Sequence, residues 1–93
     1  MLKRPVMSYH RNPAIYAAEL DGEVCLFDPV AAAYFNLNST GSTIWNLLET
    51  PLTYDEILGV LLATYPVEAQ MCRDQCLHFF TQALELGLLQ LAP

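Results

Sequence analysis

A change of hydrophobic period between residues 33 and 48 constrains the fold more than any other feature of the sequence. Residues 34–37 (Tyr-Phe-Asn-Leu) are typical of a short β-strand with one apolar face. Residues 38–40 (Asn-Ser-Thr) are of the types that cap helix N-termini. Apolar residues then recur at helical spacing through residues 44–48. We therefore expect a strand that runs directly into a helix, with strands before it and helices after it.

The residues before this point predict two further strands. Residues 14–20 and 23–28 flank Asp21-Gly22, and Asp-Gly between two strand-like runs indicates a hairpin with a type I′ turn. Both faces of the second run are apolar, so we expect the hairpin to be covered on more than one side. Asp28-Pro29 then starts a turn that leads to residues 34–37. The prediction is a three-stranded antiparallel meander whose third strand has an open outer edge.

Three helices are predicted in the second half of the chain. The first covers residues 39–49, and the second begins at Thr53, where Glu56 completes a capping box. The third covers residues 67–86 and ends at Gly87. It carries an inner apolar stripe and a neighbouring stripe that is less polar than a solvated face normally is. The inner stripe is Cys72, Cys76, Phe80, Ala83 and Leu84, and the neighbouring stripe is Met71, Gln75, Phe79 and Gln82.

Length and composition indicate one small α+β domain. We assign residues 13–93 to it, and we expect residues 1–12 to form a flexible arm or a loosely docked first strand. A hydrophobic content of 54% excludes a disordered chain. No apolar run approaches the ~18 residues of a membrane span, and no apolar signal core follows Lys3 and Arg4. We therefore expect a cytoplasmic protein without membrane contact, whose three cysteines are reduced.

The charge distribution argues against a nucleic-acid partner. Ten acidic and four basic residues give a net charge of −6, and three of the bases lie within the first eleven residues. From residue 12 to residue 93 the only lysine or arginine is Arg73. A nucleic-acid binder needs clustered lysine and arginine to neutralise phosphates. A DNA-binding transcription factor is thus disfavoured, although the helices would permit such a fold.

Metal binding and catalysis find little support in the sequence. Cys72 and Cys76 are four residues apart and share a helix face, but Cys25, His10 and His78 are not spaced to complete a zinc site. His78 follows Cys76 by two residues, so on a helix the two side chains point apart. We predict a non-enzyme without metal or cofactor, in which these cysteines are small core residues. The alternative is a small redox or catalytic domain that uses Cys72 and Cys76.

An open strand edge beside a long apolar helix suits the capture of an extended peptide. In strand addition, backbone hydrogen bonds give affinity and pockets for alternate side chains give specificity. The sequence therefore favours a protein–protein interaction module over an enzyme.

Several short motifs follow one another in a fixed order between residues 20 and 89. Residues 35–45 fit the pattern aromatic–x–Leu-Asn–x–x–Gly–x–x–Ile-Trp. Leu-Phe-Asp-Pro at 26–29, the capping box within 51–57, and Gly-Leu-Leu at 87–89 accompany it. With these motifs the chain resembles the PqqD-like family, the peptide-recognition elements of ribosomal peptide maturation.

This resemblance implies a winged helix-turn-helix-like fold that binds protein instead of DNA. It implies that the leader segment of an unmodified precursor peptide lies along the third strand, in the groove toward the third helix. The implied leader-binding residues are Ala33, Tyr34, Phe35, Asn36 and Leu37 on the strand, and Met71, Cys72, Gln75 and Phe79 on the helix.

Within the family, the chain looks most like the B1 proteins of lasso-peptide pathways, which present the precursor to a separate leader peptidase. The alternative implied by the resemblance is a PqqD-type chaperone that presents a precursor to a radical-SAM enzyme. We expect a monomer or a weak homodimer, because an open strand edge can pair with a second copy.

Overall fold

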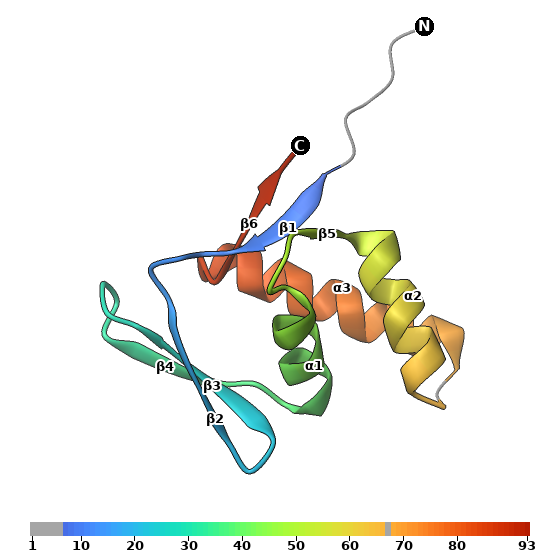
Figure 1. Cartoon of the computed structure of the whole chain (residues 1–93), viewed down its shortest axis with the longest axis horizontal. Coiled ribbons are helices and arrows are strands. Elements are labelled where there is room, and N and C mark those ends of the chain that lie inside the picture. Colours follow the sequence, from blue (N-terminus) through green and yellow to red (C-terminus); the bar gives the residue numbers. More distant parts are fainter. Residues whose placement is uncertain (1–6, 67) are drawn as a thin grey trace, which may run out of the picture.

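The computed structural model describes residues 7–66 and 68–93 and shows a small α+β fold (Figure 1). The predicted meander is present as β2 (Tyr16–Leu20), β3 (Glu23–Asp28) and β4 (Ala33–Asn36), paired antiparallel in the order β2-β3-β4. Asp21 and Gly22 have φ angles of 53° and 82°, as a type I′ turn requires. The predicted hairpin is therefore confirmed, and β4 lies at one edge of the sheet.

The meander is covered on one face only. Val24 and Leu26 of β3 are buried against the core, whereas Cys25 and Phe27 are half-buried and every residue of β2 is exposed. The expectation of cover on more than one side was wrong. Within the described residues no helix or second sheet packs on the outer face, so its apolar side chains stay partly in contact with solvent.

The first two helices begin where their capping residues predict. α1 (Ser39–Leu47) starts after Asn38, whose side chain accepts a hydrogen bond of 2.8 Å from the Gly41 N–H. α2 (Tyr54–Thr64) starts with the predicted capping box, in which Thr53 and Glu56 each accept from the other's backbone N–H.

The third helix, α3 (Ala69–Glu85), ends in a Schellman motif. Gly87 has a φ of +73°, and its N–H donates to the Leu84 carbonyl. The Leu88 N–H donates to the Ala83 carbonyl at 2.9 Å and turns the chain back toward the core. None of the helices within the described ranges has the length and apolar character needed to cross a lipid bilayer.

A second sheet joins the two ends of the described chain. It consists of β1 (Ser8–Arg11), β5 (Leu52–Thr53) and β6 (Leu89–Ala92) in the order β5-β1-β6, with antiparallel pairs. Residues 8–11, for which a flexible arm or a loosely docked first strand was expected, form the central strand of this sheet and are half-buried. Hydrogen bonding to β5 and β6 fixes their backbone. Residues 1–6 of that expected arm lie outside the described residues.

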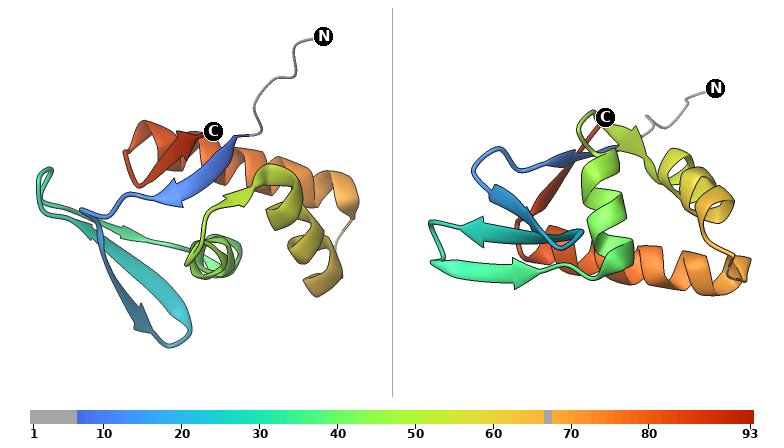
Figure 2. Two further views of the ribbon diagram at one scale, coloured as in Figure 1. Left: turned by 45° about the horizontal axis from the view of Figure 1, so that its top comes forward. Right: turned by 60° about the horizontal axis from the view of Figure 1, so that its bottom comes forward.

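The helices pack against both sheets: α1 contacts β3 of the meander, α3 contacts β6, and α2 contacts β5. α1 stands between the meander and α2, and α3 runs along the length of the molecule (Figure 2). The buried core is contributed by strands and by all three helices. Its members are Val24, Leu26, Ile44, Trp45, Leu48, Ile57, Leu58, Leu61, Cys72, Cys76, Phe80, Ala83, Leu88 and Leu89.

Candidate functional site

The outer edge of β4 carries backbone groups that have no strand partner within the described residues. The Leu37 N–H donates to the Val24 carbonyl at 2.9 Å, which makes this position a hydrogen-bonded pair. Hydrogen-bonded and non-bonded pairs alternate in an antiparallel ladder, so the backbone groups of Phe35 face β3. The N–H and C=O groups of Tyr34 and Asn36 consequently point away from the sheet and are free to bind an added strand.

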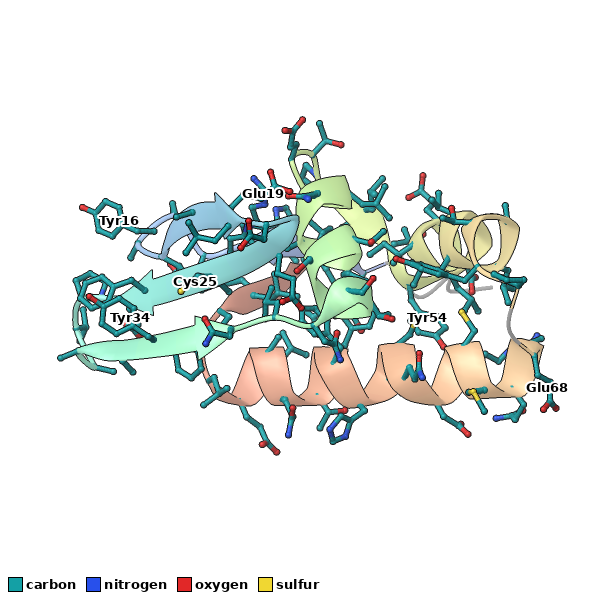
Figure 3. All side chains as sticks on the ribbon, turned by 90° about the horizontal axis from the view of Figure 1, so that it is seen from below. Tyr16, Glu19, Cys25, Tyr34, Tyr54 and Glu68 are labelled. Atoms are coloured by element: carbon teal, nitrogen blue, oxygen red, sulfur yellow. The ribbon has the colours of Figure 1, made fainter. Side chains whose placement is uncertain are left out.

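A continuous groove lies between β4 and α3 and is made of two adjoining hollows of about 290 and 310 Å³. Figure 3 shows β4 beside α3 over this region. Both hollows contain Asn36, Leu37, Phe79 and Gln82, which is why we treat them as one β4–α3 groove. The polar hollow is completed by Asn38, Thr40, Gly41, Gln75 and His78, and the apolar hollow by Tyr34, Phe35, Ala83, Leu86 and Leu88.

Phe79 lies at the centre of the groove, and Gly41 makes room for it. A Cβ atom placed on Gly41 would lie 3.1 Å from Cε2 of the Phe79 ring, closer than carbon atoms normally approach. The ring also packs edge-to-face on Phe80, with centroids 5.8 Å apart. The glycine of the 35–45 motif thus allows α3 to approach the start of α1, which brings its side chains to β4.

The structure places most of the expected strand residues in the groove. Tyr34, Phe35, Asn36 and Leu37 line it, whereas Ala33, at the start of β4, lines neither hollow. The alternating exposure of β4 puts Phe35 on the covered side and Tyr34 and Asn36 on the outer side.

The helix wall of the groove lies further toward the C-terminus of α3 than expected. Gln75 and Phe79 line the groove, but Met71 is exposed outside it. Cys72, which was expected on the wall, does not line the groove, because its side chain is 3% exposed and belongs to the core. The early turns of α3 pack on α2, and only its later turns cross β4.

Sequence reasoning missed several helix residues of the groove. Gln82 belongs to the predicted neighbouring stripe of α3 but was not among the expected leader-binding residues. The others are on the late turns and just after the helix, and no sequence signal distinguished them. They are His78, Ala83, Leu86 and Leu88.

The two helical cysteines do not contribute to the groove. Cys76 is fully buried, and burial, with a smaller effect of the neighbouring Cys72, raises its pKa to about 11. Its thiol is therefore protonated near neutral pH, which is the opposite of an activated nucleophile. Among the residues described, no group of three or more His, Cys, Asp or Glu side chains is placed to hold a metal ion.

Comparison with known proteins identifies the family. Residues 23–89 match the family described as coenzyme PQQ synthesis protein D (PqqD). The chain belongs to the PqqD family. The resemblance expected from the 35–45 motif is thereby confirmed, and the α+β fold of this PqqD-family chain agrees with similar solved structures.

Two solved structures are similar to this PqqD-family chain over most of their length. One is TbiB1 in complex with the TbiA(beta) leader peptide, with 30% identity, a TM-score of 0.79, and coverage of 87% of this chain and 94% of that chain. The other is lasso peptide synthetase B1 complexed with the leader peptide. At 24% identity, a TM-score of 0.75, and coverage of 88% and 96%, it supports the fold alone. No curated protein sequence matches the chain.

Proposed function

We propose that this chain is a non-catalytic module that binds the leader segment of a ribosomally made precursor peptide and delivers it to a modifying enzyme. The observation that carries the proposal is the open edge of β4 above the β4–α3 groove. The similar structure of TbiB1, a complex with a leader peptide, supports it.

In this proposal the leader forms a fourth strand of the meander. Tyr34 and Asn36 supply two backbone donors and two acceptors, and each hydrogen bond contributes about 0.5–1.5 kcal/mol. Side chains of the peptide that point inward enter the groove, and those between them point to solvent. The apolar hollow takes an apolar side chain, and the polar hollow takes a side chain with hydrogen-bonding groups.

We assign the enzyme partner to the leader peptidases of lasso-peptide maturation, as the resemblance to the B1 proteins of these pathways implies. The leader-peptide complex of TbiB1, at 30% identity, supports this assignment. The family description, coenzyme PQQ synthesis, favours a radical-SAM enzyme as the second candidate. The two candidates are separated by adding each purified enzyme to the precursor, with and without the module. Only the true partner should modify the precursor faster when the module is present.

Proline substitution on the two edges of the meander tests strand addition. Asn36→Pro removes a donor that points to the open edge of β4, and we expect leader affinity to fall by at least about fivefold, or about 1 kcal/mol. The matched control is Ala17→Pro on β2. The backbone N–H and C=O groups of Leu26 face β4, so those of Cys25 face β2, where Cys25 pairs with Ala18. The Ala17 N–H therefore points outward, at the opposite edge of the sheet.

Fluorescence anisotropy with a labelled leader peptide measures the affinities, and a scrambled leader tests specificity. Melting temperatures show whether each variant is folded. Tyr34→Pro provides a second substitution on the same edge. Unchanged leader affinity in both folded β4 variants would contradict strand addition.

A further inference from the structure

The outer face of the meander carries a row of aromatic side chains that the groove does not use. Strand register places Tyr16 of β2 beside Phe27 of β3, and Phe27 beside Tyr34 of β4. The Phe27 and Tyr34 rings are 4.6 Å apart between centroids. Tyr16 and Tyr34 are 69% and 72% exposed, and Figure 3 shows them at the same end of the sheet. Such a row buries a large area when a partner covers it.

Further apolar side chains extend this row along the sheet. Cys25 is half-buried in the middle of the same face, and Leu20 is 68% exposed near the hairpin turn. We call the surface formed by Tyr16, Leu20, Cys25, Phe27 and Tyr34 the outer aromatic face. Contiguous exposed apolar surface of this kind marks interaction sites in folded proteins, and exposed tyrosines are enriched in protein interfaces.

The border of the outer aromatic face is acidic. Asp21 and Glu23 lie at the hairpin turn, and strand alternation puts Glu23 on the same face as Cys25 and Phe27. No lysine or arginine occurs between residues 12 and 72, so no basic side chain of this segment balances them. A second copy of the chain would bring the same acids to this border. The complementary surface is therefore that of a different protein, apolar at its centre and bordered by lysine or arginine.

We propose that the outer aromatic face docks the enzyme that acts on the peptide held at β4. The proposal rests on the proposed function for the identity of the partner. Tyr34 belongs to both surfaces, because it lines the apolar hollow of the groove and ends the aromatic row. The face and the groove are thus continuous. A strand added at β4 would extend this face, and an enzyme seated there would contact the leader.

Charge substitutions on β2 test the docking surface without touching the groove. We choose the double variant Tyr16→Glu and Leu20→Glu, since both side chains are exposed and neither lines the groove. The matched control is Leu77→Glu on α3, an exposed leucine outside the groove and the outer aromatic face. The probe is a purified leader peptidase of lasso-peptide maturation, and its binding is measured by biolayer interferometry in the absence of peptide.

We expect the double variant to bind the peptidase at least about tenfold more weakly than the wild type, because interface tyrosines often dominate binding. The leader affinity should stay within about twofold of the wild type, and Leu77→Glu should leave both affinities unchanged. Wild-type affinity for the peptidase should fall as salt rises from about 50 to about 500 mM, because the border is charged.

Peptidase binding by the folded double variant at wild-type strength would overturn the proposal. An equal loss of peptidase affinity in Leu77→Glu would overturn it as well. The loss would then follow from an added negative charge at any surface position. If the wild type forms a dimer and the double variant does not, the outer aromatic face binds a second copy of the chain instead. Absence of leader binding by the wild type would count against the proposed function and not against the face, because the peptidase is measured without peptide.

Discussion

Cys76 is fully buried on α3, and Cys72 lies one helical turn away. In this position a thiolate would lose its hydration without gaining a cationic partner, so the protonated form is favoured and the pKa rises to about 11. The sequence alone already disfavoured a metal or redox role for the pair. The structure supplies the physical reason, which is that both side chains pack in the core.

This raised pKa predicts a loss of stability in alkaline solution. The unfolded thiol titrates near its ordinary value of 9.0, so between that pH and about 11 the folded state holds a proton that the unfolded state has released. The free energy of unfolding is therefore undiminished below pH 9 and falls as pH rises toward 11, by at most about 2–3 kcal/mol.

Denaturant unfolding at pH of about 8 and about 10.5 measures this loss. Cys76→Ala should lose less free energy of unfolding over that interval than the wild type, although it is less stable at both values because of the cavity. Burial also raises the pKa of Tyr9 and Tyr54, so the variant keeps part of the pH dependence. The contribution of Tyr54 is smaller in the variant, because Cys76 adds to the rise of the Tyr54 pKa. An identical pH dependence in the two proteins would show that Cys76 does not titrate in this way.

Gly41 gives a second prediction for a single residue. In Gly41→Ala the new methyl group would push the Phe79 ring, which is 3.1 Å from the Cβ position, toward the open groove. The better helix propensity of alanine offsets part of the packing cost, so we expect a nearly unchanged melting temperature. Leader affinity should fall by about fivefold, equivalent to about 1 kcal/mol.

The control for this substitution is Gly59→Ala on α2, where a Cβ atom meets nothing within 4 Å. That variant should gain about 0.5–1 kcal/mol of stability and bind the leader as the wild type does. Titrations of both variants with the same labelled leader make the comparison. Equal leader affinities in the two variants would show that Phe79 does not contact the peptide.

At the scale of elements, hydrogen bonds of the Ser42 side chain link the meander to α1. Its hydroxyl accepts a hydrogen bond of 2.9 Å from the Val24 N–H and donates one of 3.2 Å to the Leu37 carbonyl. It thus replaces the second backbone hydrogen bond that the Val24–Leu37 pair would otherwise make. One buried hydroxyl thereby fixes where β4 ends relative to β3, and it holds the groove strand against the helix that follows.

Ser42→Ala should therefore cost about 1–3 kcal/mol of unfolding free energy, because the buried Val24 N–H would lose its partner. Ser39→Ala, at an exposed position in the first turn of the same helix, should cost less than about 0.5 kcal/mol. Urea unfolding curves of the two variants provide the measurement. If Ser42→Ala were no less stable than Ser39→Ala, a water molecule or a shifted backbone would be satisfying the Val24 N–H.

Elements specified by nearby residues were predictable from the sequence, and those specified by distant ones were not. The Asp21-Gly22 turn, the Thr53 capping box and the Gly87 helix end were found because each rests on contacts within a few residues. β1 was expected only as one of two alternatives for residues 1–12, because its partner β6 lies about 80 residues later and the short polar run Ser8–Arg11 shows no clear apolar alternation.

Tertiary contacts outside the strand hold β1 in place. The Arg11 guanidinium lies 4.9 Å from the centre of the Trp45 ring and donates to the Trp45 carbonyl. The Asn12 side chain donates to the Gly87 carbonyl at 2.7 Å. The helix wall of the groove lies further along α3 than predicted for a similar reason. A helical stripe gives the face of α3 that meets β4, but only the crossing of the two elements determines which turns do so.

At the scale of the whole molecule, charge separates the two surfaces assigned to ligands. The chain has a net charge of −6, and the acids that border the outer aromatic face include Asp21 and Glu23. The β4–α3 groove, by contrast, is lined without a single Lys, Arg, Asp or Glu. A winged-helix fold that binds DNA needs the opposite arrangement, with clustered bases on the binding surface.

This separation predicts different salt dependence for the two binding events. Leader binding rests on backbone hydrogen bonds and apolar contacts, so its affinity should change by less than about threefold between about 50 and about 500 mM salt. Binding of the peptidase should weaken steeply over the same range, because charges across a solvent-exposed border are screened. Parallel titrations in the same buffers, with uncharged and basic versions of the leader, make the comparison. A steep salt dependence for the uncharged leader would mean that the acidic border, and not the groove, dominates capture of the peptide.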